Sequence, residues 1–313
     1  GLLAPKKMLY HMRSAKIGAK MRPDIPQDTK GGITMTLKEA ITLFGYHQRS
    51  NLRARTVRSY LLLLQRFEVQ FGERSFDSIG SDEIFQFLET LTGNHSRSTR
   101  RLRYAQLKAL LNFLIDKCNL NMKNPCDTPL LSKAFKTPKQ VARRILDREI
   151  VEELIYNTQT LRDRLILELQ ARCGLRIGET LKIKVSDAVD RRLILKEPKS
   201  GKESEVAFMP EQIAKRLHDY IQQENLSPGD RIFPICYSTA RALIKNLGGR
   251  LNVVLTPHDL RRYSATYASR NGVPLEIVSK VILRHQDLKT TQAYLGRVTE
   301  SEAIRWMDVL HGR

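Results

Sequence analysis

Apolar residues recur with helical spacing through the first third of the chain, beginning at residue 36. The segment Thr36-Leu-Lys-Glu39 forms a capping box, and Leu37, Ile41 and Phe44 fall on one face of the helix that follows it. Three more periodic stretches begin near residues 56, 81 and 98, and Ser81 is the expected N-cap of the second of these. The last stretch, 98–117, is the longest. This pattern predicts a small helical bundle over residues 35–126.

Two segments beside this bundle lack a hydrophobic period. Residues 1–34 are basic, with Pro23, Pro26 and two glycines near their end, and we interpret them as a basic arm or an incomplete module. Residues 127–146 contain Pro129, Pro138 and several Lys and Arg, without an apolar repeat. Their composition predicts an extended linker between two domains.

Beyond the linker the pattern changes between helical and strand periods. Asp147 is the expected N-cap of one helix, and a second helix is expected to stop at Gly174. Two short apolar runs, 193–195 and 206–208, flank the polar sequence Lys199-Ser-Gly-Lys202, which predicts a β-hairpin. Helical spacing resumes after residue 211. The expected fold class is mainly α with a small β-sheet, in which a mixed α/β domain over residues 147–313 follows the bundle.

The charge of the chain indicates the kind of partner it binds. The 313 residues contain 53 Lys and Arg against 33 Asp and Glu, a formal net charge of +20. Residues 1–135 hold 22 basic and 11 acidic side chains, and residues 136–313 hold 31 and 22, so the balances are +11 and +9. A surplus of this size favours a polyanionic partner, first of all nucleic acid. Because both halves are basic, we expect them to grip duplex DNA from two sides.

The composition gives no support to several other classes of function. No apolar run is long enough to cross a bilayer, and no basic amphipathic segment stands apart as a membrane-surface helix. The four cysteines have no C-x-x-C spacing, which argues against a zinc site or a disulfide framework and favours a reduced, cytoplasmic protein. A Gly-rich nucleotide loop and a carboxylate cluster are both absent from the sequence. We therefore predict no metal and no cofactor.

Three stretches of the second domain combine basic side chains with helix starts. They are Gly174-Leu-Arg176-Ile-Gly-Glu179, Thr256-Pro-His258-Asp-Leu-Arg261-Arg and Leu283-Arg-His285-Gln-Asp-Leu-Lys-Thr-Thr-Gln-Ala-Tyr294. In the second stretch, Thr256 and Pro257 fit the N-cap and first residue of a helix that ends near Gly272. His258 and Arg261 then share a face of this helix and can address one anion at its N-terminus.

These stretches resemble the conserved boxes of the tyrosine recombinases, the family that includes phage integrases and the Xer chromosome-dimer resolvases. The resemblance extends over roughly residues 36–310 and rests on four separated motifs in the family's order. It implies a SAM-like core-binding bundle and a catalytic domain that close around DNA. It maps the family's catalytic set to Arg176, Lys199, His258, Arg261, His285 and Tyr294, with Glu179 at a supporting acidic position.

The resemblance gives these side chains roles in breaking a phosphodiester bond. Tyr294 is the nucleophile that forms a 3′-phosphotyrosine, and Arg176, Arg261 and His285 stabilise the charge that develops on the nonbridging oxygens. His258 accepts the phenolic proton or holds the phosphate. Because the phosphotyrosine conserves the energy of the bond, rejoining needs neither ATP nor a metal.

The hairpin lysine and the nucleophile both have neighbours of the same residue type. Lys199 is expected to protonate the departing 5′ oxygen, with Lys196 and Lys202 as alternatives on the same hairpin. Tyr263 and Tyr267 are alternatives for the nucleophile, but they follow the His and Arg pair of the second box at spacings expected for packing.

The chain departs from the family's pattern at two positions. Arg262 stands where family members commonly have His, and Arg284 stands where they commonly have Gly. Neither position belongs to the core catalytic set, so we expect the changes to affect local packing or target choice. Glu179 also has a simpler interpretation as an ordinary helix-start carboxylate, although an acid there would orient the neighbouring basic groups.

Basic residues outside the boxes are candidates for contacts with the DNA backbone. Four arginines cluster at the start of the longest helix rather than alternating with acids, which favours phosphate contacts over an ordinary solvated face. These candidates are Arg97, Arg100, Arg101 and Arg103, and Lys202 on the hairpin is a fifth.

The end of the chain predicts an assembly. After Gly296 an amphipathic helix with Ala303, Ile304, Met307 and Leu310 is expected, and it can pack on its own domain or, as the resemblance favours, on a neighbouring protomer. The implied partners are double-stranded DNA with inverted-repeat recombination sites, further copies of the chain in a homo-tetramer on paired sites, and accessory proteins where the reaction needs them. No membrane partner is expected.

Two other functions are compatible with a related chemistry or fold. A type IB topoisomerase relaxes supercoils as a monomer, but the third-box histidine, the bundle and the tail helix favour a recombinase. A catalytically silent DNA-binding regulator is disfavoured by the intact catalytic set. The predicted function is site-specific recombination in the cytoplasm at the nucleoid, by integration, excision or resolution, as in a mobile element.

Overall fold

The structure is a computed structural model that describes residues 36–51, 54–117, 120–136, 145–198, 201–295, 304 and 306–309. For residues 48–51, 54, 55, 76, 293 and 294 it describes the backbone only. The chain divides into two compact units after residue 140. The predicted N-terminal arm, 1–34, lies outside the described residues.

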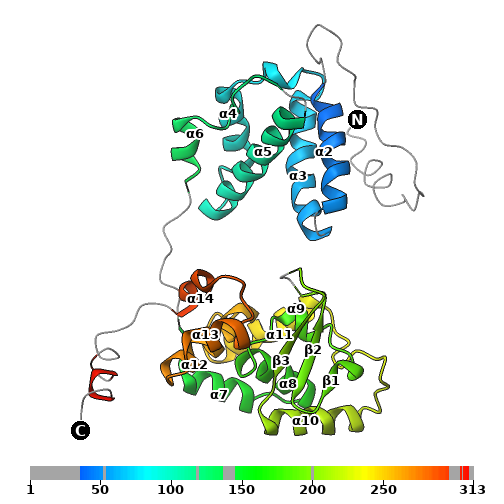
Figure 1. Ribbon diagram of the computed structural model, residues 1–313, viewed down its shortest axis with the longest axis vertical. Helices are drawn as coiled ribbons and strands as arrows, with labels where there is room; N and C mark the ends of the chain where they lie inside the picture. Colours follow the sequence, from blue (N-terminus) through cyan, green and yellow to red (C-terminus); the bar gives the residue numbers. More distant parts are fainter. Residues whose placement is uncertain are drawn as a thin grey trace. The chain divides into compact units, whose positions relative to one another are not determined.

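The first unit is a bundle of helices, as the hydrophobic periods predict (Figure 1). Its main helices are α2 (Leu37–Asn51), α3 (Ala54–Phe71), α4 (Ser81–Thr92) and α5 (Arg97–Lys117), with a 3-10 turn at Phe76–Ser78. The predicted capping box is confirmed, because the backbone N–H of Thr36 donates to Glu39 Oε2 at 2.9 Å. The expected cap of α4 is wrong by one residue: Gly80 is the N-cap, and its N–H donates to the carboxylate of Glu83.

The expectation of an extended linker from residue 127 is wrong for its first part. Residues Pro129–Ala134 form helix α6, whose N-cap Thr128 accepts a hydrogen bond from the backbone N–H of Leu131. Leu131 and Phe135 are buried in the core of the bundle. A pair of apolar residues four positions apart is enough to dock one short helix, but it is too short to show a period in the sequence. Residues 137–144 lie outside the described part of the chain.

The second unit combines helices with a small sheet. Its helices are α7 (Arg148–Tyr156), α8 (Leu161–Ala171), α9 (Ile177–Thr180), α10 (Glu211–Gln223), α11 (Tyr237–Arg250), α12 (Pro257–Arg270), α13 (Leu275–Ile277), the π-helix η3 (Val278–Ile282) and α14 (Leu288–Leu295). The strands are β1 (Ala188–Val189), β2 (Arg192–Lys196) and β3 (Ser204–Phe208). A 3-10 turn, Val185–Asp187, precedes β1.

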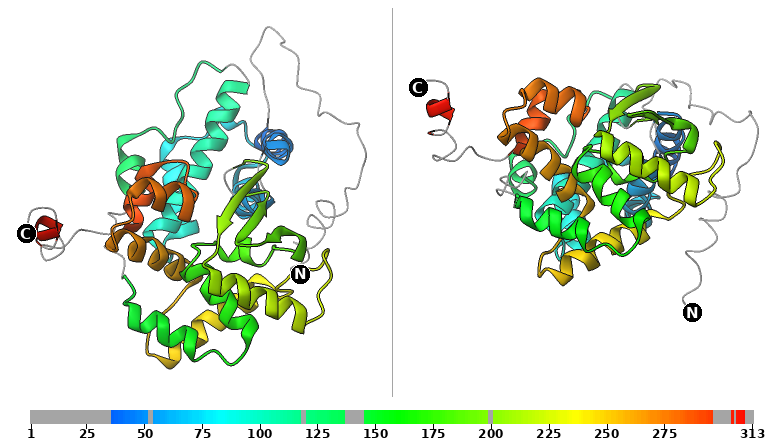
Figure 2. Two further views of the ribbon diagram at one scale, coloured as in Figure 1. Left: turned by 60° about the horizontal axis from the view of Figure 1, so that its bottom comes forward. Right: turned by 90° about the horizontal axis from the view of Figure 1, so that it is seen from below.

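Helix α8 lies in the middle of the second unit. Leu165 and Leu169 pack against the sheet and α10, whereas Leu167 and Ala171 pack against α7, α11 and α12. Figures 1 and 2 show the sheet on one side of the unit and α12, α13 and α14 together on the other. A helix between two cores is buried around most of its circumference, which accounts for the run of buried residues 165–171, Glu168 and Gln170 included.

The predicted hairpin is confirmed. The strands pair antiparallel in the order β1-β2-β3, with Leu193 opposite Ala207 and Leu195 opposite Glu205. The two leucines and the alanine face the core with α8 and α10. The tip of the hairpin at residues 199 and 200 lies outside the described residues.

Gly174 allows a close approach between the first and third boxes. Its φ of +64° lies in the left-handed region that favours glycine, as the predicted helix stop requires. A Cβ atom placed on it would lie 2.8 Å from the carbonyl oxygen of Ile282. A backbone oxygen cannot move aside as a flexible side chain would, so any larger residue here would push the two boxes apart.

We expect Gly174→Ala to lower the free energy of unfolding by about 2–4 kcal/mol, because it combines left-handed strain with a backbone clash. Urea denaturation of purified protein measures this change. Gly178→Ala is the matched control, because a Cβ there meets no atom within 4 Å and the position is helical. It should leave stability unchanged or raise it by up to about 1 kcal/mol. Equal losses in the two variants would contradict the role of Gly174.

Candidate active site

Arg176 and Glu179 form a close pair at the start of α9. Arg176 is the N-cap of this short helix, and its backbone N–H donates to Glu179 Oε2 at 2.9 Å. Its guanidinium Nη1 lies 2.5 Å from Glu179 Oε1. The carboxylate therefore holds both the backbone and the side chain of the arginine, whose guanidinium remains partly exposed to solvent.

Arg261 is a buried residue of the second box that makes hydrogen bonds to the first and third boxes. It lies on α12 and is 1% exposed. Its Nη1 donates to the carbonyl oxygen of Gly174, and its Nη2 donates to the carbonyl oxygen of Leu283. Thr256 is the N-cap of this helix and Pro257 its first residue, as predicted. The carboxylate Oδ2 of Asp259 accepts a hydrogen bond from the backbone N–H of Thr256 at 2.9 Å. The fold of the second unit therefore depends on this arginine as much as the proposed chemistry does.

His285 is held in the third box by its backbone and its ring. Its N–H donates to the carbonyl oxygen of Ser279 at 2.9 Å, and its Nδ1 lies 2.9 Å from Oγ1 of Thr291. Burial, followed by the charges of Arg261 and Arg176, lowers the pKa of His285 to about 4. The imidazole is thus neutral at pH 7 in the protein without DNA.

We expect the Cε1–H resonance of His285 to titrate with a midpoint near pH 4 in the free protein, far below the ordinary value of 6.5. The unfolded chain then takes up the proton first, so stability is present above about pH 6.5 and is lost as the pH falls toward 4. An NMR titration tests this, with His285→Gln identifying the resonance. A bound phosphodiester should raise the midpoint, because its negative charge offsets the arginines. A midpoint near 6.5 in the free protein would contradict the burial described here.

Arg284 is a candidate functional residue that the sequence showed only as a departure from the family pattern. It is 7% exposed and has a φ of +53°, which suits the glycine that family members commonly have there. Its Nη2 donates to Glu179 Oε2 at 3.1 Å and to the carbonyl oxygen of Gly174 at 3.2 Å. Its Nε lies 3.8 Å from Glu205 Oε2 of β3. The departure from the family pattern is therefore a buried cation that connects the third box to the first box and the sheet.

The charges around Glu179 keep this carboxyl ionised. Burial alone would raise the pKa of Glu179, but Arg284 and Arg176 outweigh burial and hold the pKa below its ordinary value. Burial lowers the pKa of Arg284, and the nearby carboxylates of Glu179 and Glu205 oppose that effect. The acid is thus a common anchor for two arginines from different boxes.

His258 and Tyr294 complete the three boxes along the chain. His258 is the second residue of α12, is exposed, and lies near enough to His285 to contribute to the lowering of its pKa. Tyr294 lies in α14, where the structure describes its backbone but not its side chain. Its place in the reaction therefore stays a prediction.

The lysines of the hairpin have different surroundings. Lys196 Nζ lies 2.5 Å from Asp187 Oδ1, which anchors it at the base of the hairpin. Lys202 is exposed just before β3. Lys199 lies outside the described residues. The ion pair makes Lys196 the weakest alternative to Lys199 as the proton donor.

Three of the four arginines at the start of α5 interact with other side chains or backbone groups of the bundle. Arg100 pairs with Glu89 of α4, and Arg103 donates to a backbone carbonyl of α3 and to a glutamine of α5. Arg101 lies over the ring of a tyrosine one turn later, and Arg97 is exposed. Contacts of these side chains with DNA stay a prediction, and the internal partners of Arg100 and Arg103 would compete with a phosphate.

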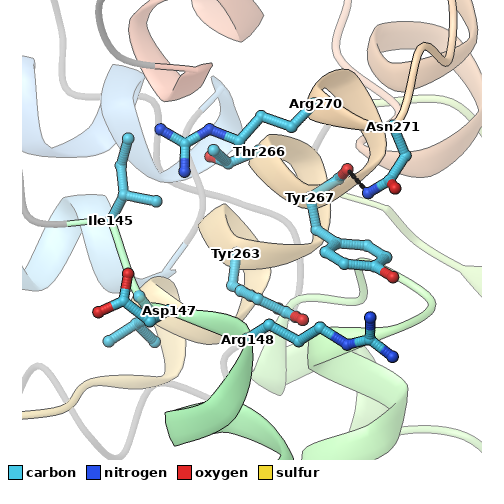
Figure 3. A pocket seen from close by; sticks show the side chains of 9 residues that line it. Ile145, Asp147, Arg148, Tyr263, Thr266, Tyr267, Arg270 and Asn271 are labelled. Carbon is cyan, nitrogen blue, oxygen red and sulfur yellow. Dashed lines mark hydrogen bonds between the residues drawn. The ribbon is translucent and has the colours of Figure 1, made fainter. Parts of the chain in front are cut away.

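A pocket of about 220 Å³ lies beside α7 and α12 and contains none of the predicted catalytic residues (Figure 3). Tyr263 and Tyr267 line it, with ring centroids 5.5 Å apart. Tyr263 is 6% exposed, and burial raises its pKa to about 12. These contacts confirm the expected packing role of Tyr263 and make it a poor nucleophile at neutral pH.

The described residues offer neither a metal-binding cluster nor a membrane-spanning helix. Within the ranges that the structure describes, no group of three or more His, Cys, Asp or Glu side chains could hold a metal ion. In the same ranges, every helix is too short or too polar to cross a membrane.

Comparisons with known proteins agree with the boxes and the bundle. Residues 144–300 match the phage integrase family, and residues 44–117 match the N-terminal SAM-like domain of phage integrases. The chain is 26% identical over 309 residues to the tyrosine recombinase XerD of Proteus mirabilis, a match that covers 92% of this chain and 96% of that protein. It is 29% identical over 159 residues to the tyrosine recombinase XerA of Saccharolobus solfataricus, covering 50% of this chain and 53% of that protein.

A solved structure shares the fold of both units. The chain is similar to a lambda integrase dimer bound to a COC′ core site, with a TM-score of 0.69 at 17% identity, over 85% of this chain and 98% of that one. This likeness agrees with the expectation of a mainly α protein with a SAM-like bundle and a small sheet. Since the family match spans half of the chain and includes all three boxes, the protein belongs to the phage integrase family, whose members are also called tyrosine recombinases.

Proposed function

We propose that the protein is a site-specific DNA recombinase that cuts and rejoins strands through a 3′-phosphotyrosine at Tyr294. The observation that carries this proposal is the convergence of Arg176, Arg261 and His285 from three separated boxes. Arg261 donates to backbone carbonyls of the first and third boxes, and its charge and that of Arg176 both act on His285. A cluster of cations around a neutral imidazole is suited to a phosphodiester that gains negative charge in its transition state.

In the proposed cleavage, the phenolic oxygen of Tyr294 attacks the phosphorus and forms the new P–O bond. The bond to the 5′ oxygen breaks, and that oxygen leaves as a hydroxyl after it takes a proton from Lys199. The phenolic proton passes to His258. Attack by the 5′ hydroxyl of another strand reverses these steps, so that the tyrosine is released and no external energy source is consumed.

The proposed partner is double-stranded DNA with inverted-repeat sites. The net charge of +20, spread over both units, supports the binding of a duplex. The similar lambda integrase structures are a dimer bound to a COC′ core site and a tetramer bound to a Holliday junction. A homo-tetramer on two paired sites is therefore the assembly we propose, in the cytoplasm at the nucleoid, with accessory proteins where direction must be set.

We also propose that the chain end docks on a neighbouring protomer. Ile304, Met307 and Val309 are helical in the structure and are 61%, 57% and 64% exposed. Trp306 lies between them in sequence, and a Cβ atom on Gly272 would meet its ring at 2.9 Å, which shows that the tail also reaches the end of α12. Apolar side chains left exposed beside such a contact support an additional partner surface.

A strand-transfer assay separates the recombinase from a topoisomerase. A duplex with a nick beside the cleavage position should trap a protein–DNA adduct, and a second duplex with the same site should receive the cut strand. A plasmid without a site should be relaxed slowly or not at all. Efficient relaxation with no transfer between sites would favour the topoisomerase, and DNA binding without an adduct would favour the silent regulator.

A further inference from the structure

Thr291 connects the helix of the nucleophile to the histidine of the third box. It lies in α14 three residues before Tyr294, on the same face of the helix. Its side chain is completely buried, and its Oγ1 lies 2.9 Å from Nδ1 of His285. The same hydroxyl donates to Oγ of Ser279 at 2.9 Å, and that serine is also completely buried. The steps proposed for cleavage give neither hydroxyl a role.

The direction of these hydrogen bonds selects a tautomer of the histidine. A threonine hydroxyl has one proton, and the geometry of the pair makes Thr291 the donor to Ser279. The oxygen of Thr291 can therefore only accept from His285, which places the ring proton on Nδ1. In a neutral imidazole, Nε2 is then the nitrogen that can accept a proton. Ser279 supports the arrangement twice, because its carbonyl oxygen also accepts from the backbone N–H of His285.

We infer that Thr291 is a positioning residue that holds His285 in the Nδ1–H tautomer and makes this state depend on the docking of α14. The inference rests on the proposed function for its consequence in catalysis. When α14 is docked, Tyr294 is brought to the site, and Nε2 of His285 is the nitrogen that takes up a proton and can then donate to the charged nonbridging oxygens. When α14 leaves, the nucleophile is withdrawn and Nδ1 loses its partner at the same time. A single contact thus couples the presence of the nucleophile to the state of the histidine.

Two variants separate the hydroxyl from the bulk of the side chain. Thr291→Val keeps the shape and removes the hydroxyl, whereas Thr291→Ser keeps the hydroxyl and removes a methyl group. Thr290→Val is the matched control, because Thr290 is the exposed neighbour in the same helix. Thermal unfolding of each variant shows whether it is folded.

The first readout is the tautomer in the full-length protein without DNA. With 15N-labelled histidine at pH 7, NMR of the wild-type protein, the Thr291→Ser variant and the Thr290→Val variant should show the proton of His285 on Nδ1. In Thr291→Val the proton should move to Nε2, because Nδ1 no longer has an acceptor. A proton on Nε2 in the wild-type protein, or an unchanged Nδ1–H form in Thr291→Val, would overturn the inference. If Thr291→Val does not fold, the wild-type and Thr291→Ser spectra still decide the tautomer.

The second readout is the rate of adduct formation on the nicked duplex. Thr291→Val should slow it by roughly 10- to 100-fold, a part of the 10²- to 10⁴-fold that acid–base catalysis contributes. Thr291→Ser should stay within about 3-fold of the wild-type rate, a difference of roughly 0.7 kcal/mol in the barrier. An equal loss in both variants would make Thr291 a packing residue and refute the inference. Absence of any adduct from the wild-type protein would refute the proposed function instead, and the NMR result would still stand by itself.

Discussion

Tyr294→Phe should form no covalent adduct with a nicked duplex, whereas the wild-type protein accumulates one. The substitution removes only the phenolic oxygen, which is the atom that bonds to phosphorus in the proposed reaction. DNA binding should be unchanged, because the aromatic ring remains. Denaturing gel electrophoresis of the protein with end-labelled DNA measures the adduct, and an electrophoretic mobility shift measures binding.

Tyr267→Phe is the matched control for this experiment. Tyr267 lies on α12, is 39% exposed and lines the pocket beside α7, whose lining includes none of the predicted catalytic residues. Its variant should form the adduct at the wild-type rate. An adduct that persists in Tyr294→Phe would show that another residue is the nucleophile, and loss of the adduct in Tyr267→Phe would point to this tyrosine.

Arg176→Ala should slow adduct formation by roughly 100- to 1,000-fold, the loss that follows removal of one preorganised donor to a developing charge. The affinity for DNA should change by only a few fold, because the contact is strongest in the transition state. Single-turnover cleavage and fluorescence anisotropy measure the two quantities. Arg176 suits this test better than Arg261, whose guanidinium is buried and donates to two backbone carbonyls. Replacement of Arg261 would also destabilise the fold.

Arg172→Ala is the control that matches the change in charge. Arg172 is exposed four residues before Arg176, and its Nη2 lies 2.7 Å from Glu152 Oε2. An exposed ion pair of this kind contributes little to stability. Its variant should cut at a rate close to the wild-type value. A similar loss of binding and cleavage in both arginine variants would make Arg176 a general phosphate contact instead of a transition-state contact.

The sequence predicted the elements whose signals are local. The capping box of α2, the Thr256 N-cap of α12, the hairpin and the break at Gly174 each depend on a few neighbouring residues, and the structure has all of them. The resemblance then selected the boxes. The spacing of the boxes along the sequence could not predict that they converge around His285, because this convergence depends on how α8, α9 and α12 pack.

The contacts that the sequence missed are those between distant segments. Arg284 was recognised only as a departure from the family pattern, since its partners Glu179 and Glu205 lie far away in the sequence. Thr291 had a weak local signal in its position three residues before Tyr294, but its bonds to His285 and Ser279 require the folded third box. Helix α6 was missed because one short turn has too few residues to show a period.

The two carbonyl acceptors of Arg261 affect when the second unit can fold during synthesis of the chain. A ribosome completes Gly174 and Arg261 well before Leu283, so the arginine has only one of these acceptors while the third box is still being made. A buried guanidinium with half of its partners missing opposes compact packing. The second unit should therefore close only after the third box has emerged from the ribosome, by which time Tyr294 has also been added. A nascent chain that already holds a folded bundle would therefore still lack a closed second unit.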